Sequence, residues 1–238
     1  MLAYRSHRSG FSLVEMSIVI VVIGLILAAV MKGQTVIDAA RVRALISEVN
    51  TYKTAVNSFY AKYNALPGDF TEARIYWTAS NTQNGNGDGR LSFKNGAGIY
   101  EGYQAWQHLS NENMVATPFL GTQTTAVAEL DKDIPKARTG GGYFFDYGSI
   151  AQLLTDNILV LGTPLASRDR LVVDGTVSAK QAYEMDIKTD DASPVSGAIQ
   201  AQEGSTGKPE TCVDPKHNRY AIAVEGKNCV VGFKLITQ

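Results

Sequence analysis

The chain has 238 residues, of which 45% are hydrophobic and 19% are charged, with 22 Lys and Arg against 23 Asp and Glu. A formal net charge of −1 gives no excess of positive charge for a phosphate backbone, so no nucleic acid is predicted as a partner. About 200 residues remain outside the first apolar segment, which is enough for a domain with its own core.

The first predicted element is an apolar helix over residues 11–31, in which Glu15 is the only charged residue. Its 21 residues rise about 32 Å as a helix, which spans a hydrocarbon core of about 30 Å. The run is longer than the apolar region of a secretory signal peptide, which has about 7–15 residues. Arg5, His7 and Arg8 precede it without an acid. Positive flanks stay cytoplasmic, so we expect the N-terminus on the cytoplasmic side of the membrane and the residues after Lys32 on the opposite side.

Glu15 lies one helical turn into this segment. A carboxylate at the centre of a membrane helix costs roughly 2.5–3.5 kcal/mol, and somewhat less near an interface. One interpretation is that the side chain reaches back to the lipid headgroups. The other is that it pairs with a new N-terminal ammonium, formed at Phe11 by cleavage after Gly10 and carried by an incoming copy of the chain. In a low dielectric that pair is strong and penalises wrong registers.

The order Gly10-Phe11-Ser12-Leu13-Val14-Glu15 before an apolar run resembles the class III leader of type IV pilins and type II secretion pseudopilins. The resemblance covers residues 1–55. It implies that residues 1–10 are a leader, that a prepilin peptidase cuts between Gly10 and Phe11 and N-methylates Phe11, and that Glu15 sets subunit register in a helical filament.

The same resemblance implies partners and a location. The partners are copies of the chain or other pilin-like subunits, the prepilin peptidase and methyltransferase, and an inner-membrane assembly platform. The chain is expected in the bacterial inner membrane before assembly and then in a periplasmic or extracellular filament. Many members of the family carry a proline where this chain has Lys32. Proline removes a helical hydrogen bond and marks a stretch that melts on assembly. Here melting has to rely on Gly24 and Gly33, each about 1 kcal/mol less favourable than Ala.

A second helical pattern follows, with no proline before Pro67. Its apolar positions repeat at steps of three and four and form one stripe: Val42, Leu45, Val49, Tyr52, Val56, Phe59, Tyr63 and Leu66. An ordinary amphipathic core helix has the same pattern. Because no breaker separates the two patterns, we expect one helix over residues 11–65, roughly 80 Å long, with a globular head over residues 66–238. Leu66-Pro67-Gly68-Asp69 should end the helix.

Residues 80–98 are rich in Asn, Gly and Ser and are predicted to form a loop. Within it, Asn84, Asn86 and Asp88 alternate with glycines. This order resembles the first half of an EF-hand-type calcium loop, with Arg90 lending its carbonyl oxygen.

The twelfth position of such a loop holds Asn95 instead of the bidentate Glu. Glu101, or another acid such as Asp69, would have to complete the six to eight oxygens that calcium takes. The alternative is a glycine-rich turn without an ion, because Asn and Asp tolerate left-handed backbone. Calcium is therefore a possible cofactor, and no other cofactor is predicted.

Short helices are predicted over Tyr103–Leu109, Ser149–Leu154 and Ser178–Gln181, the last with a capping box formed by its two end residues. His108, beside the apolar face of the first, is interpreted as a satisfied core or surface histidine. Residues 136–142 are expected to form a loop. Asp190-Asp191 is a second and weaker cation candidate.

The C-terminal residues Tyr220–Val224 and Cys229–Leu235 are predicted to pair as a hairpin. Cys212 and Cys229 suit a disulfide better than a metal site, because no second Cys pair or His cluster accompanies them. A disulfide would place the domain in an oxidising compartment, in agreement with the predicted orientation. The alternative is two reduced thiols in the core.

No catalytic motif of the GxSxG, HExxH, P-loop or GxGxxG type occurs, so an enzyme is not predicted. The expected fold is α+β: a long N-terminal transmembrane and amphipathic helix packed on a globular head with a small C-terminal antiparallel sheet. The expected function is that of a structural subunit of a type IV pilus or type II secretion pseudopilus. The alternatives are a minor pilin or adhesin whose head binds DNA, a surface or a secreted protein, and a plain signal-anchor protein.

Overall fold

The computed structural model describes residues 10, 12–78, 81–94, 98, 100–122, 127–148, 156–166 and 171–235, and every structural statement below concerns these residues. The chain divides into two compact units, Met1–Ala40 and Arg41–Gln238. Each unit is described by itself.

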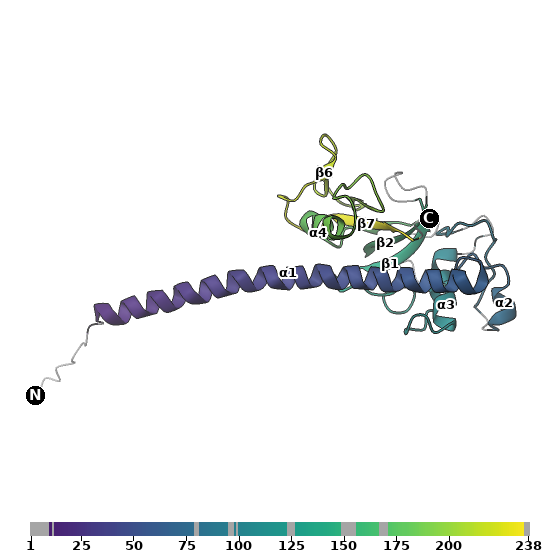
Figure 1. Ribbon diagram of the computed structural model, residues 1–238, viewed down its shortest axis with the longest axis horizontal. Coiled ribbons are helices and arrows are strands. Elements are labelled where there is room, and N and C mark those ends of the chain that lie inside the picture. Colours follow the sequence, from purple (N-terminus) through teal and green to yellow (C-terminus); the bar gives the residue numbers. More distant parts are fainter. Residues whose placement is uncertain are drawn as a thin grey trace, which may run out of the picture. The chain divides into compact units, whose positions relative to one another are not determined.

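Helix α1 spans Leu13–Tyr63 (Figure 1). The predicted long helix is confirmed, and it ends shortly before Pro67, as expected. Asn64 follows in the left-handed region, with φ of 50°, and its N–H donates to the Tyr60 carbonyl at 2.8 Å, which closes the last turn.

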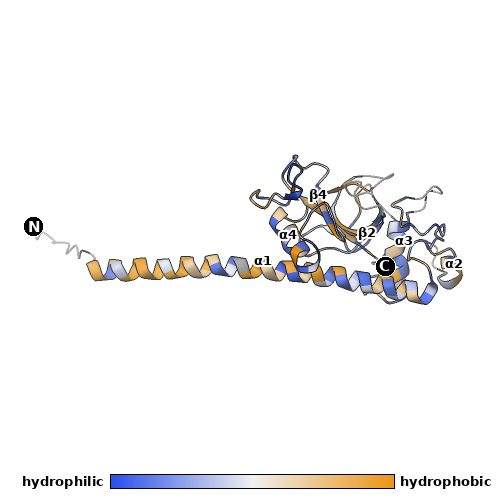
Figure 2. Ribbon diagram, turned by 45° about the horizontal axis from the view of Figure 1, so that its top comes forward, coloured by the Kyte–Doolittle hydropathy of each residue, from blue (hydrophilic) through white to orange (hydrophobic). Residues whose placement is uncertain are grey.

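In the first unit, the residues of α1 whose side chains are described are almost all exposed, and up to Met31 they are mainly apolar (Figure 2). Leu13 is 90% exposed and Ile20 is 71% exposed. By length and composition this helix can cross a membrane.

In the second unit, the outer part of α1 contributes the predicted stripe to the core. Val42, Leu45, Val56 and Phe59 are 0% exposed. Tyr52 packs against the core with its ring centroid 4.9 Å from that of Trp106. The stripe therefore buries against the head, as its spacing predicts.

The head contains an antiparallel sheet with the strand order β1-β2-β7-β4. The strands are β1 (Gly142–Tyr147), β2 (Asn157–Pro164), β7 (Cys229–Lys234) and β4 (Ile199–Glu203), with β3 (Val173–Asp174) paired to the end of β2 and a separate ribbon of β5 (Val213–Asp214) and β6 (Arg219–Tyr220). The antiparallel sheet is confirmed. It is larger than predicted, because β1 and β2 come from the middle of the chain.

The predicted hairpin of Tyr220–Val224 with Cys229–Leu235 is wrong. Strand β7 pairs with β2 on one side and β4 on the other, so it has no free edge for a further strand. Tyr220 pairs with Val213 instead. Residues 221–224 form an exposed turn, closed by a hydrogen bond from the Val224 N–H to the Ala221 carbonyl at 2.9 Å.

Two further predicted helices are confirmed as α3 (Glu101–Asn111) and α4 (Ala179–Thr189). Ser178 and Gln181 form the predicted capping box, in which Gln181 N–H donates to Ser178 Oγ at 3.2 Å. The short helix α2 (Ala73–Tyr76) was not predicted. The helix predicted over Ser149–Leu154 lies outside the described residues.

The remaining predicted loop, residues 136–142, is largely irregular, and Gly142 begins β1. This loop and strand β1 both attach to α1, because Arg138 Nε of the loop donates to Glu48 Oε1 at 2.8 Å and the Tyr143 hydroxyl of β1 donates to Glu48 Oε2 at 2.8 Å. Helix α3 packs on β1, with the Trp106 and Phe145 ring centroids 4.2 Å apart.

The outer edge of β4 is covered by the chain itself. The Ile199 N–H donates to Asp190 Oδ2 at 2.8 Å, and the Ala201 N–H donates to the Pro194 carbonyl at 2.9 Å. The predicted break at residues 190–194 therefore has a second role, because it satisfies backbone donors of an edge strand.

Candidate functional site

The predicted assembly residues lie at the start of α1. Gly10 is exposed, and Phe11 lies outside the described residues. Glu15 is in the first turn, where the Ser12 N–H donates to its Oε2 at 2.9 Å. The Val14 N–H donates to Ser12 Oγ at 3.3 Å. Ser12 and Glu15 thus form a variant of the capping box, in which Ser12 Oγ accepts from the second helical N–H instead of the third. The sequence analysis missed it, although the Ser-x-x-Glu spacing signals a capping box.

The capping box explains how the acid is held before assembly. The first N–H groups of a helix have no partner within the helix, and the helix dipole favours negative charge there. The Glu15 carboxylate therefore stays close to the chain end that cleavage after Gly10 would create.

A cluster of carboxylates lies in the head. Asp69, Asp88 and Glu101 each offer an oxygen, and these three oxygens lie within 4.8 Å of one another. Asp69 is 4% exposed and Glu101 is 0% exposed. Burial raises the pKa of Asp69, against the opposing effect of backbone N–H groups that donate to it.

The glycine-rich loop wraps around the Asp69 carboxylate. Oδ1 accepts from the N–H groups of Gly87 at 2.6 Å and Asp88 at 3.2 Å, and Oδ2 accepts from that of Gly89 at 2.8 Å. A Cβ on Gly85 would meet the Asp69 backbone at 2.2 Å, so only glycine allows this approach.

Of the other predicted calcium ligands, one lies beside the cluster and two have side chains that contact other residues. Asn86 lies next to the cluster, where its Nδ2 donates to Asp88 Oδ2 at 3.0 Å. The Asn84 amide oxygen instead accepts from the Arg74 N–H at 2.9 Å. The Arg90 guanidinium lies over the Tyr147 ring, 4.8 Å from its centroid. Asn95 lies outside the described residues.

The donor set fits an oxygen-preferring cation. A carboxylate has about four lone-pair sites, so an oxygen that accepts a backbone hydrogen bond can still bind a metal. Three carboxylates within 4.8 Å of one another suit the hard-cation chemistry of calcium. The cluster is thus a group of acids that can hold a metal ion.

A second carboxylate cluster contains Asp186, Asp190 and Asp191, of which the sequence analysis named only the last two. Asp186 is 0% exposed, and the Tyr220 hydroxyl donates to its Oδ2 at 2.7 Å. Burial raises the pKa of Asp186 to about 6. Burial lowers the pKa of Lys53 in α1, and the negative charge of Asp190 offsets part of this lowering. These acids therefore have partners within the chain.

His108 is a core histidine, as one of the two interpretations predicted. It is 0% exposed, and the Gly68 N–H donates to its Nδ1 at 2.9 Å. The ring lies against Trp77, with centroids 5.0 Å apart. Burial lowers the pKa of His108 to about 4, so the ring is neutral at pH 7.

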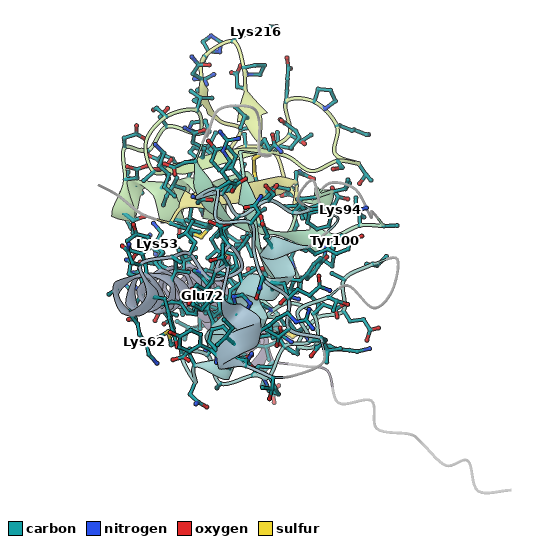
Figure 3. All side chains as sticks on the ribbon, turned by 90° about the vertical axis from the view of Figure 1, so that its right-hand side faces the viewer. Lys53, Lys62, Glu72, Lys94, Tyr100 and Lys216 are labelled. Atoms are coloured by element: carbon teal, nitrogen blue, oxygen red, sulfur yellow. A yellow bond between two sulfur atoms is a disulfide. The ribbon has the colours of Figure 1, made fainter. Side chains whose placement is uncertain are left out.

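The disulfide between Cys212 and Cys229 is confirmed, and both residues are 0% exposed. Cys229 is the first residue of β7, and Cys212 precedes β5 directly. The bond therefore ties the β5–β6 ribbon to the central sheet. Lys216, at the turn of that ribbon, lies far from the α1 end of the head (Figure 3).

Residues 5–31 match the family described as the prokaryotic N-terminal methylation motif. The match includes the order from Gly10 to Glu15 and the apolar run that follows it. Among solved structures, the major type IV pilin PilA1 from Clostridium difficile matches with 14% sequence identity and a TM-score of 0.38, over 84% of this chain and 98% of that chain. None of the curated proteins compared with the chain matches it.

Proposed function

We propose that the protein is a structural subunit of a type IV pilus or type II secretion pseudopilus. The observation that carries this proposal is the methylation motif over residues 5–31, whose apolar part is the first part of the 51-residue helix that begins at Leu13. A prepilin peptidase cuts between Gly10 and Phe11 and methylates the new amine. The apolar part of α1 then assembles with the same part of other subunits.

The exposed apolar surface of α1 suits both the membrane-inserted subunit and the assembled subunit. In the membrane it faces lipid, and in the filament it packs against equivalent helices, so it stays out of water in both states. The inner membrane is accordingly the location before assembly. The head lies on the oxidising side, consistent with its disulfide.

Glu15 sets the position of each incoming subunit relative to its neighbour in the filament. The methylated Phe11 amine of an incoming subunit pairs with Glu15 of its neighbour, away from water. An unpaired carboxylate costs more there than in solution, so shifted arrangements are disfavoured. The proposed partners are other pilin-like subunits, the prepilin peptidase and the assembly platform. The comparisons do not favour the alternative of a minor pilin or adhesin.

The mature N-terminus tests this proposal directly. Mass spectrometry of the protein purified from cells with an active prepilin peptidase should give a chain that starts at Phe11 and carries one extra methyl group. A Gly10→Val variant, expressed in the same cells, should keep the leader, because the peptidase would no longer recognise the site. A wild-type chain that retains residues 1–10 would refute the pilin proposal and support a plain signal-anchor protein.

We also propose that the carboxylates of Asp69, Asp88 and Glu101 hold calcium, with Asn86 beside them. A cation there would offset the repulsion between three acids whose oxygens lie within 4.8 Å of one another. It would also fix the glycine-rich loop against the turn that ends α1.

Removal of calcium should therefore lower the melting temperature of the full chain. With calcium 100-fold above its Kd, the shift on adding chelator is roughly 5–10 °C for a domain of this size. Asp88→Ala should remove this response, and Asp191→Ala, in the other acidic cluster, should retain it. Identical melting curves of the wild type with calcium and with chelator would contradict the proposed site.

A further inference from the structure

A cleft of about 1000 Å³ lies in the head, in the unit Arg41–Gln238. Four segments form it: the end of α1, the turn after it, the glycine-rich loop and the residues that flank the β1–β2 connection. The size is that of a small-molecule site, since such pockets have volumes of about 300–1,000 Å³. The proposed assembly of the subunit does not use this cleft.

Several polar groups that line the cleft make no hydrogen bond within the described residues. The hydroxyls of Tyr60, Thr71 and Tyr147 make no hydrogen bond to any part of the described chain. The Asp156 carboxylate accepts one hydrogen bond, from the Asn157 N–H to Oδ1 at 2.8 Å, and its Oδ2 accepts none within the same residues. A ligand with several donors and acceptors would therefore meet available partners from three segments.

When no cation is bound at Asp69 and Asp88, the charges of the lining disfavour acidic ligands. The carboxylates of Asp69, Asp88 and Asp156 outnumber the single guanidinium of Arg90. A cleft with an excess of one charge concentrates the field of that sign and repels ligands of the same sign. Phosphorylated, sulfated or carboxylated compounds are disfavoured on this ground, and a purely apolar compound would leave these groups without water or partners.

The two tyrosine rings of the cleft differ in how accessible they are to a ligand. The Tyr147 ring is covered by Arg90, at 4.8 Å. The Tyr60 ring is 43% exposed and borders the cleft. An exposed aromatic ring beside polar groups offers one apolar face and one hydroxyl. This combination matches a pyranose, which has a face of C–H groups and a rim of hydroxyls.

We propose that this cleft binds a saccharide that lacks acidic groups. Its C–H face packs on Tyr60, and its hydroxyls donate to Asp156 and exchange hydrogen bonds with the hydroxyls of Tyr147 and Thr71. The Arg90 guanidinium stays on Tyr147 and limits the space on that side. This inference goes beyond the role of the chain as a filament subunit and does not depend on it.

Saturation-transfer NMR on the full chain in detergent micelles, with a chelator present so that no cation offsets the lining carboxylates, tests the proposal. The probes are chitotriose and maltotriose, which are neutral, and trigalacturonic acid, which has the same length and three carboxylates. We expect transfer to at least one neutral trisaccharide and none to the acidic one. Tyr60→Ala should weaken binding of that trisaccharide about tenfold, because it removes the ring against which the sugar packs.

Tyr76→Ala is the matched control, because Tyr76 is 55% exposed and does not line the cleft. It should bind as the wild type does, and Asp156→Asn, which keeps an acceptor for the Asn157 N–H, should bind more weakly. Transfer to none of the three probes, equal transfer to the acidic probe, or an equal loss in Tyr76→Ala would overturn the proposal. Each of these results leaves the processing of the N-terminus unaffected, so the two proposals fail separately.

Discussion

Glu15→Gln is expected to insert into the membrane as the wild type does and to be almost absent from filaments. Insertion should not suffer, because the substitution removes a charge from an apolar segment. Incorporation should fall because the amine of the incoming subunit loses its partner. Loss of one member of a buried ion pair costs roughly 3–5 kcal/mol, equivalent to a hundredfold or more in an equilibrium constant. Immunoblots of sheared filaments and of membranes measure both quantities.

The capping box makes Gln the informative substitution. Gln at the third helical position can still accept from the Ser12 N–H, so the start of α1 is kept while the charge is lost. Ser17→Ala is the control, because its hydroxyl only donates to the Val14 carbonyl in the same helix. If Glu15→Gln enters filaments normally and Glu15→Ala does not, the acid serves as a helix cap and the proposed register role is refuted.

The second large effect is expected from loss of the disulfide. The double variant Cys212→Ala with Cys229→Ala should lose about 3 kcal/mol of unfolding free energy, since the bond closes a loop with a sequence separation of 17 residues. For a head of this size the melting temperature should fall by roughly 6–12 °C. Thermal unfolding followed by near-UV circular dichroism reports this change.

Reductant provides the control for this prediction. It should lower the melting temperature of the wild type by a similar amount, and it should leave that of the double variant unchanged. Should the double variant unfold at the wild-type temperature, the bond contributes nothing to stability, and the β5–β6 ribbon is held by packing alone.

The parts of the fold that were predictable from sequence have local signals. Helix α1 follows from an apolar run and a stripe with steps of three and four, with no proline before Pro67. Helix α4 follows from the capping box of Ser178 and Gln181. The disulfide follows from the presence of only two cysteines, which leaves one possible pairing within the chain.

The sheet was predicted poorly because strand pairing is not local. Residues 220–224 and 229–235 are two apolar runs with a turn between them, which is the usual signal of a hairpin. The partners of β7 are instead β2 and β4, which lie 26 or more residues earlier in the chain. Strand β2 itself has a continuous apolar run, Ile158–Leu161, and short buried runs of this kind do not reveal their neighbours.

The carboxylate cluster was predictable only in part for a similar reason. Asp88 was named from the loop pattern, whereas Glu101 and Asp69 were named only as acids that would have to complete the ligand shell. Its place at the centre depends on the contact of the Leu66-Pro67-Gly68-Asp69 turn with the loop, which glycine at position 85 permits. Asp186 had no sequence signal of its own, because its partner Tyr220 lies 34 residues away.

The covered edge of β4 has a consequence for the proposed filament, in which many heads would lie at high density. An open strand edge is a template on which a second chain can add in register, and this addition leads to amyloid-like aggregates. Asp190 and the Pro194 carbonyl already occupy the donors of Ile199 and Ala201. Crowded heads could therefore touch along this edge without pairing their sheets, and the proposed polymerisation would depend on the N-terminal helices alone.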